Sequence, residues 1–170
     1  MATTAFKGTP VRTVGDLPAT GRPAPAFTLT RADLSEATLA TYAGKVKILN
    51  LVPSLDTAVC AASARRFNTE IARLDGAVVL NISADLPFAQ KRFCESEGLR
   101  SVESLSTFRS PAFGTAYGAR IEGGPLSGLL ARAVLVLDRS DRVVYAQLVP
   151  EITQEPDYAA ALAAAKAALG

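Results

Sequence analysis

Histidine and tryptophan are absent from this chain of 170 residues, and cysteine occurs only twice. The lack of an imidazole base excludes a Cys-His or Ser-His hydrolase mechanism. Most zinc and iron sites require histidine or more than two thiolates, so we expect no metal site. The glycine patterns of Walker and dinucleotide-binding loops are also missing, and we expect no bound cofactor. Any chemistry of this chain must therefore run without imidazole.

Charge of one sign is not in excess either. Lysine and arginine number 18 and aspartate and glutamate 16, a net charge of +2 that does not predict a nucleic acid or membrane partner. No apolar run approaches the roughly 20 residues that span a bilayer, and residues 1–13 lack the apolar segment of a signal peptide. We therefore expect a cytoplasmic protein. In that compartment two cysteines favour a transient redox use over a permanent disulfide.

The chain is expected to form one domain. Its length and its hydrophobic fraction of 49% suit a single core. Residues 1–22 contain several glycines and prolines around a short β-rich segment, which indicates an N-terminal hairpin arm. No later linker divides the chain, so residues 1–170 are predicted to fold as one unit with this arm. The glycine-containing stretch 118–128 is expected to be a surface loop.

Apolar periodicity predicts a strand, a helix and a second strand in the first half of the chain. Residues 45–52 and 76–85 are rich in leucine and β-branched side chains, as buried strands are. Between them, apolar residues recur at helical spacing from Val59 to Leu74. This order implies a parallel strand pair with a right-handed crossover.

The second half predicts a helix, further strands and a closing helix. Pro87 and Gly98 bracket the helix. A short strand in 101–108 and an antiparallel hairpin in 132–149 follow, and the alanine-rich segment 154–170 is helical in character. This element order is that of an α/β thioredoxin-like fold, in which helices flank a central mixed sheet.

Cys60 stands just after the first predicted strand, within the stretch PSLDTAVC. Open α/β sheets bind ligands at the carboxyl ends of their strands. If Thr57 is the N-cap of the next helix, Cys60 is its third residue and lies close to free backbone N–H groups. Helix N-termini favour anions and activate cysteines placed there. The position favours a reactive thiolate, and the alternative is an inert, buried cysteine.

The spacing of the other candidate residues gives weaker indications of a functional role. Cys94 shares its helix with Phe88 and Phe93, which favours a packing role. Arg132 reads as a solvated strand end. Arg65 and Arg66 read as surface charges or as charges near the site.

Pro53, Thr57 and Cys60 form the pattern P-x-x-x-T-x-x-C, which resembles the peroxidatic motif of the peroxiredoxins. The longer PSLDTAVCAASARRFN, together with SADLPFAQKRFC, is similar to the thiol peroxidase branch of that family, the atypical two-cysteine peroxiredoxins. The similarity extends over essentially the whole chain, including GLLARAVLVLD. Ala58 departs from the proline that many relatives carry, and we expect this to affect rigidity more than chemistry.

The resemblance implies a role for each of five residues. Cys60 is the expected peroxidatic nucleophile, which becomes a sulfenic acid on attacking a peroxide. Thr57 is expected to orient the peroxide, and Pro53 to shield the thiolate from water. Arg132 matches the arginine that stabilises thiolate and peroxide, and its permanent charge replaces the missing histidine. Cys94 matches the resolving cysteine.

The resemblance further implies a disulfide between Cys60 and Cys94 that thioredoxin reduces. Cys60 opens one predicted helix, whereas Cys94 lies near the end of the next. Because a disulfide requires Cα atoms within roughly 7 Å, we expect the helices to unwind locally. The segment Leu86 to Gly98 is therefore predicted to be mobile.

Alternatives remain open from the sequence. The expected substrates are hydrogen peroxide and organic hydroperoxides; an apolar surround of Phe88, Phe93 and Leu129 would suit the latter, unless these residues belong to the core. The same cysteine pair would also serve a redox sensor, and an inert scaffold requires an ordinary Cys60 thiol. The resemblance implies a homodimer, which the sequence alone does not show.

Overall fold

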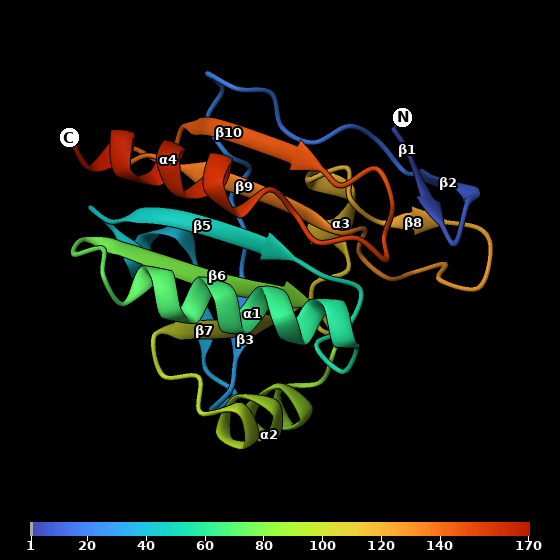
Figure 1. The fold of residues 1–170 in the computed structure, drawn as a ribbon, viewed down its shortest axis with the longest axis horizontal. Helices are drawn as coiled ribbons and strands as arrows, with labels where there is room; N and C mark the ends of the chain where they lie inside the picture. The colour runs from blue at the N-terminus through green and yellow to red at the C-terminus, as the bar shows by residue number, and fades with distance from the viewer. Residues whose placement is uncertain (1) are drawn as a thin grey trace.

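A seven-stranded mixed sheet runs through the centre of the molecule (Figure 1), and the computed structural model describes residues 2–170. Its strands are β3 (Leu29–Arg31), β4 (Glu36–Ala37), β5 (Val46–Leu51), β6 (Ala77–Ser83), β7 (Val102–Ser106), β9 (Ala133–Leu137) and β10 (Val143–Leu148). They lie in the order β10-β9-β5-β6-β7-β3-β4. The thioredoxin-like α/β fold expected from the sequence is confirmed.

The centre of the sheet is parallel, as the apolar runs predicted. β5 pairs in parallel with β6, and β6 with β7. Every residue of β5 is buried, because helices or loops cover both faces of this strand. On the other side, β9 pairs antiparallel with β5 and with β10, which confirms the predicted hairpin.

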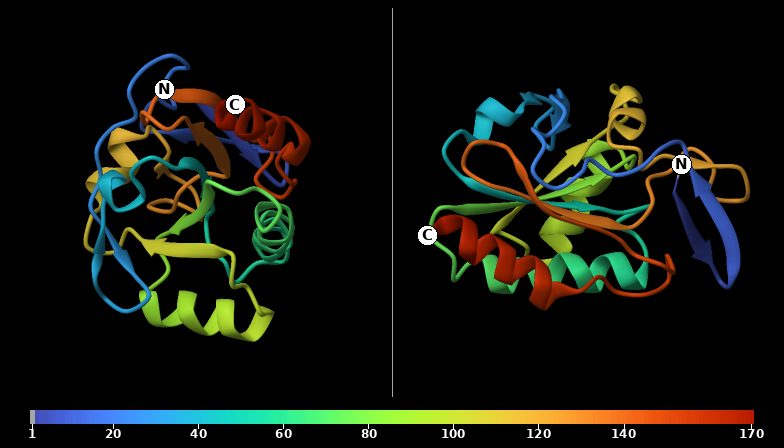
Figure 2. Two further views of the ribbon diagram at one scale, coloured as in Figure 1. Left: turned by 90° about the vertical axis from the view of Figure 1, so that its left-hand side faces the viewer. Right: turned by 90° about the horizontal axis from the view of Figure 1, so that it is seen from above.

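Helices cover both faces of the sheet (Figure 2). The helices are η1 (Leu39–Tyr42), α1 (Ala58–Ile71), α2 (Pro87–Glu97), α3 (Ala112–Ala116) and α4 (Tyr158–Leu169). On one face, Phe67 and Ile71 of α1 form a core with Leu162 of α4. On the other, the rings of Phe113 and Tyr117 stack with centroids 4.4 Å apart. α2 lies apart from these layers, beside β7.

A second, smaller sheet forms at one end of the molecule. β1 (Thr3–Phe6) and β2 (Thr9–Thr13) make an antiparallel hairpin, and β8 (Ile121–Glu122) pairs with β2. The expectation of a simple surface loop over 118–128 was therefore wrong in part. Backbone groups on the free edge of β2 pair with β8, and Ile121 is buried beneath the hairpin.

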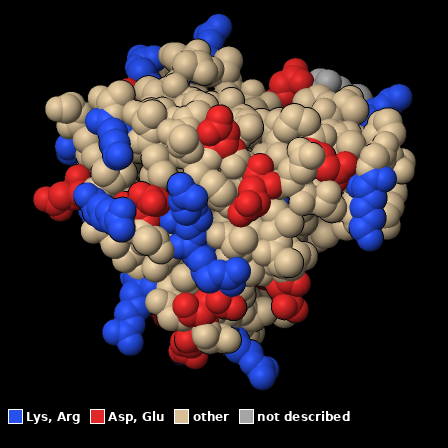
Figure 3. Space-filling view, in the orientation of Figure 1, with Lys and Arg blue, Asp and Glu red and all other residues tan. Residues whose placement is uncertain are grey.

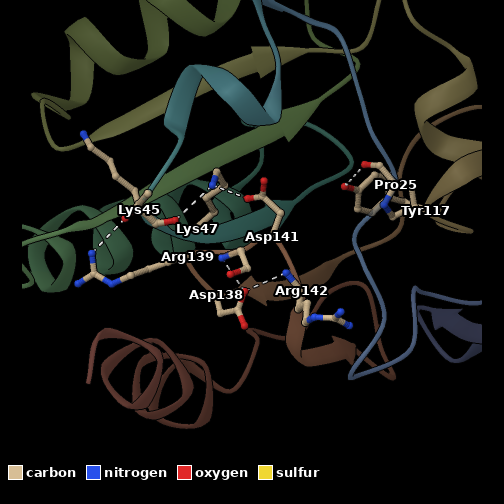
Figure 4. A network of polar contacts seen from close by, with 10 residues as sticks. Pro25, Lys45, Lys47, Tyr117, Asp138, Arg139, Asp141 and Arg142 are labelled. Carbon is tan, nitrogen blue, oxygen red and sulfur yellow. Dashed lines mark hydrogen bonds and ion pairs between the residues drawn. The ribbon is translucent and has the colours of Figure 1, made fainter.

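An ion pair between a buried lysine and a partly exposed aspartate ties the β9–β10 turn to the amino end of β5 (Figure 4). The Nζ atom of Lys47, which is fully buried, lies 2.5 Å from Oδ1 of Asp141 and donates to the carbonyl of Lys45 at 3.2 Å. A buried cation needs such partners, since an unpaired one would be strongly destabilising. This pair fixes the end of β5 that lies away from Cys60.

Charged side chains of both signs are interspersed over the face shown in Figure 3. None of the helices within residues 2–170 combines the length and hydrophobicity needed to cross a bilayer.

Candidate active site

Thr57 caps the amino end of α1 and places Cys60 in its first turn. Thr57 has an extended backbone, and its Oγ1 accepts a hydrogen bond from the backbone N–H of Cys60 at 3.3 Å. The same hydroxyl donates to the carbonyl of Ser54 at 3.2 Å. The helix begins at Ala58, so the N-cap predicted from the sequence is confirmed. Backbone dipoles at this end of α1 favour negative charge near the Cys60 sulfur.

Arg132 contacts the Cys60 sulfur directly. Its guanidinium Nη1 donates to Sγ at 3.1 Å, and both residues are almost completely buried. Interpreting Arg132 as a solvated strand end was wrong, because the residue precedes β9 at a point where the chain faces the start of α1. A permanent cation in a site of low dielectric favours negative charge on the adjacent sulfur.

A backbone carbonyl holds the other side of the guanidinium. Arg132 Nε donates to the carbonyl of Ile152 at 2.7 Å. The N–H of Ile152 in turn donates to the carbonyl of Ala5 in β1 at 2.8 Å. Nearby, the Oγ1 of Thr4 donates to the carbonyl of Val149 at 2.7 Å. The N-terminal hairpin therefore supports the segment that orients Arg132.

The carboxylate of Glu151 fastens this hairpin at its turn. It accepts hydrogen bonds from the backbone N–H groups of Lys7 and Gly8, each at 3.0 Å, and from the N–H and hydroxyl of Thr153. These donors, led by Gly8, lower the pKa of Glu151 to about 2. The contact therefore persists in its ionised form at neutral and mildly acidic pH.

Buried amides lie beneath the first turns of α1. Ser63 donates from Oγ to the carbonyl of Cys60 at 3.0 Å. Asn50 Nδ2 lies 3.4 Å from Ser63 Oγ and donates to Asn81 Oδ1 at 2.9 Å. Sequence reasoning missed this support. Its signal was an asparagine in each of two mostly apolar strands, at paired positions of β5 and β6.

A groove of about 630 Å³ opens beside Thr57, between the start of α1 and α2. Leu55, Ala61 and Phe93 give it an apolar side, and Asp85 and Arg92 a polar one. The expected apolar surround is confirmed only for Phe93. Phe88 is 67% exposed, and neither it nor Leu129 lines the groove. Pro53, by contrast, is buried in the loop that leads to Thr57.

Cys94 is a free, half-buried thiol in α2, and Cys60 is also free. Cys94 and Phe93 pack against the apolar cluster that contains Cys60, Leu55 and Leu99. The sulfur of Cys94 lies 3.3 Å from the hydroxyl of Ser104. Burial raises the pKa of the Cys94 thiol, and the contact with Ser104 opposes that shift. The resting structure therefore keeps Cys94 protonated and packed.

The two arginines that follow Cys60 lie on the exposed side of α1. Arg65 forms an ion pair with Glu97 of α2, with Nη1 and Oε2 2.9 Å apart. Arg66 lies 3.6 Å from the carboxylate of Glu70. Both are surface charges, and neither contacts Cys60 in any described interaction. Within residues 2–170, no group of three or more His, Cys, Asp or Glu side chains is placed to hold a metal ion.

Comparisons with known proteins agree on one family. The redoxin family matches residues 19–162. A thiol peroxidase of Leptospira interrogans is 53% identical over 171 residues, covering 99% of this chain and 100% of that protein. A thiol peroxidase of Mycobacterium bovis is 53% identical as well, covering 96% and 98%. A peroxiredoxin-like protein from Aquifex aeolicus, solved by crystallography, has a TM-score of 0.93 at 41% identity and covers 99% and 98%. This chain therefore belongs to the redoxin family and, within it, to the thiol peroxidases, a branch of the peroxiredoxins.

Proposed function

We propose that this thiol peroxidase reduces hydrogen peroxide and organic hydroperoxides through a sulfenic acid on Cys60. The Cys60 thiolate attacks the terminal peroxide oxygen, the O–O bond breaks, and water or an alcohol leaves after protonation. The observation that carries this proposal is the 3.1 Å hydrogen bond from Arg132 to the Cys60 sulfur at a helix N-terminus. A cation placed there also stabilises the negative charge that develops on the leaving oxygen.

Thr57 and Pro53 complete the proposed site. Thr57 is exposed and lines the groove, and we assign its hydroxyl to binding a peroxide oxygen. The buried Pro53 lacks an N–H group and limits the access of water to the thiolate. The apolar side of the groove at Leu55 and Phe93 supports organic hydroperoxides as substrates. Comparing the rates with hydrogen peroxide and with cumene hydroperoxide tests this preference.

We assign the resolving role to Cys94. Its thiolate attacks the Cys60 sulfenic acid, an S–S bond forms, and hydroxide leaves as water. Thioredoxin then supplies two electrons and two protons to restore both thiols. The apolar cluster that now buries Cys60 and packs against Cys94 must open for this step. Two free thiols suit a reducing compartment, and we assign the enzyme to the cytoplasm.

A peroxide assay coupled to thioredoxin tests these assignments in three proteins: wild type, Cys60→Ser and Cys94→Ser. We expect steady thioredoxin oxidation with wild type and none with Cys60→Ser. Cys94→Ser should consume one equivalent of peroxide and then stop. Robust cycling by Cys94→Ser would contradict its resolving role, and one oxidation without turnover in wild type would favour a redox sensor.

We also propose that the enzyme is a homodimer, as the family resemblance implies. Size-exclusion chromatography with light scattering measures the mass directly. The chain mass is 17.7 kDa, so a single species near that value would contradict the proposal.

A further inference from the structure

The carboxylate of Asp85 lies between the loop that precedes Cys60 and the helix α2, which carries Cys94. Asp85 is in the loop that joins β6 to α2, at the edge of the groove. Its Oδ1 accepts a hydrogen bond from the Ser54 hydroxyl at 2.7 Å, and its Oδ2 accepts one from the Leu55 N–H at 2.8 Å. Ser54 and Leu55 belong to the short loop between β5 and α1. The entry to α2 is thus tied to the loop that precedes Cys60.

Asp85 is itself held by groups from the sheet. Its Oδ2 accepts a second hydrogen bond, from the Ser83 hydroxyl at 2.7 Å, and its carbonyl accepts one from the Ser106 hydroxyl at 2.5 Å. The backbone N–H of Asp85 donates to Ser83 Oγ at 3.3 Å. The carboxylate is therefore held at a defined position with respect to β6 and β7.

The same network continues into α2 through Gln90. Gln90 is fully buried, and its Nε2 donates to Ser83 Oγ at 3.1 Å and to the carbonyl of Leu105 at 3.0 Å. Gln90 and Pro87 are the only residues of α2 that are buried. A continuous path of hydrogen bonds thus runs from α2 through Ser83 and Asp85 to Ser54 and Leu55.

We propose that Asp85 is a positioning residue that couples the seating of α2 to the conformation of the loop before Cys60. This inference rests on the proposed roles of Cys60 and Cys94. While α2 is seated, the carboxylate holds the loop so that Pro53 and Thr57 surround the thiolate. When α2 leaves to bring Cys94 toward Cys60, Gln90 withdraws from Ser83, and the loop is released. Asp85 thereby favours reaction with peroxide and opposes premature disulfide formation.

The two steps can be measured separately. In a Cys94→Ser background, only Cys60 oxidation occurs, and its rate is followed by stopped flow with hydrogen peroxide. Asp85→Asn replaces one acceptor oxygen with an NH₂ group. That group then faces the Ser54 hydroxyl or the Leu55 N–H, which are donors to the carboxylate in the wild type. We expect Cys60 oxidation to slow by roughly 10- to 100-fold, because a small displacement of the groups around a reacting atom has an effect of this size. With Cys94 present, we expect the Cys60–Cys94 disulfide to form faster after oxidation than in wild type.

Asp75→Asn is the matched control, because Asp75 is an exposed residue in the connection from α1 to β6. It should change neither rate. Ser54→Ala removes the hydrogen bond to Oδ1 and the acceptor of the Asp56 N–H, but keeps the carboxylate and its other contacts. It should slow oxidation several-fold and serves as the second variant if Asp85→Asn does not fold.

Unchanged oxidation in Asp85→Asn or Ser54→Ala, or an equal slowing of both steps, would overturn the proposal. Failure of the Cys94→Ser protein to consume one equivalent of peroxide would instead contradict the proposed function.

Discussion

The two helices that carry the cysteines are held in very different ways. α1 has a side-chain cap at Thr57 and buries five residues, including Phe67 and Ile71 in the core. α2 has no side-chain cap and buries only two. Helices with few buried apolar contacts are the parts of a protein that open most easily. The proposed peroxidatic thiol is thus built on a fixed element, and the proposed resolving thiol on an element that is held by fewer contacts.

The proposed roles of the two cysteines give this difference a functional reason. A nucleophile needs a geometry fixed to within a fraction of an ångström, which packing and capping supply. A resolving thiol has to move, and this movement costs less free energy when little apolar surface must be exposed to water. The following predictions test the contrast between the fixed and the detachable cysteine.

Arg132→Lys should give the largest effect. A lysine ammonium on a flexible stem does not reproduce the two contacts that the planar guanidinium makes with Cys60 and Ile152. We expect the rate of Cys60 oxidation to fall by about 100-fold, as for the loss of one oriented donor in a catalytic site. Stopped-flow peroxide consumption measures it. Arg139→Lys, at the other end of the sheet, is the control, and equal losses in both variants would contradict a specific role.

Oxidation should expose α2 but not α1. Trypsin can cleave after Lys91 and Arg92 in α2 and after Arg65 and Arg66 in α1, and all four residues are exposed. We expect cleavage in α2 to become at least several-fold faster in the disulfide form, while cleavage in α1 stays the same. Mass spectrometry of timed digests of reduced and oxidised protein gives both rates at once. Equal cleavage of α2 in the two forms would show that it does not unfold locally.

Thr57→Val should destabilise the start of α1 and slow peroxide reduction at Cys60. The variant loses the cap on Cys60, which costs about 1 kcal/mol of unfolding free energy. For a chain of this size, that loss lowers Tm by roughly 2–4 °C. The same substitution at Thr69, whose hydroxyl bonds only the carbonyl of Arg65 on the exposed face of α1, should change Tm less and leave peroxide reduction intact. A similar Tm for both variants would exclude the capping role.

The smallest effect of a substitution is expected at Ser104, whose contact influences the ionisation of Cys94 during disulfide formation. Burial raises the pKa of Cys94 above its ordinary value of 9.0. The neutral thiol therefore prevails at neutral pH, and resolution should accelerate as pH rises toward and beyond 9.0 because the thiolate is the nucleophile. Ser104→Ala removes a contact that lowers the pKa, so the variant should form the disulfide a few-fold more slowly at neutral pH.

Rapid alkylation followed by mass spectrometry measures this step across the pH range. Ser101→Ala, on the same segment but without a side-chain contact to Cys94, is the control. A pH-independent rate would mean that α2 opens before Cys94 ionises, so that opening limits resolution.

The sequence predicted the fixed element better than the detachable one. Local signals define the start of α1: a buried strand, the polar SLDT segment and apolar residues at helical spacing. Only the family resemblance pointed to Arg132 as a neighbour of Cys60, since the position of its guanidinium depends on a carbonyl 20 residues away and on the N-terminal hairpin. Contacts between distant segments leave no periodic pattern in a single sequence. For the same reason, the periodicity of the sequence did not predict that β2 pairs with β8.

Asp85 illustrates the same limit. It reads as an ordinary loop carboxylate before a proline-started helix, and nothing in its spacing indicates Ser54 as a partner. The contact exists because β5 and β6 are parallel neighbours, so the loops after them meet at one edge. The topology was predicted, but the particular side chains that meet there were not.

The segment that orients Arg132 also has a consequence for the order in which the chain folds. It depends on pairing between Thr4 and Val149, which are 145 residues apart. Contacts across such long stretches of chain form slowly, because a large loop must close first. The unit of β5, α1 and β6 spans only Val46 to Ser83 and can assemble from near segments, so Cys60 acquires its guanidinium partner late. Peroxide reactivity should thus return only with the final phase of refolding, which makes the thiol a reporter of the completed native state.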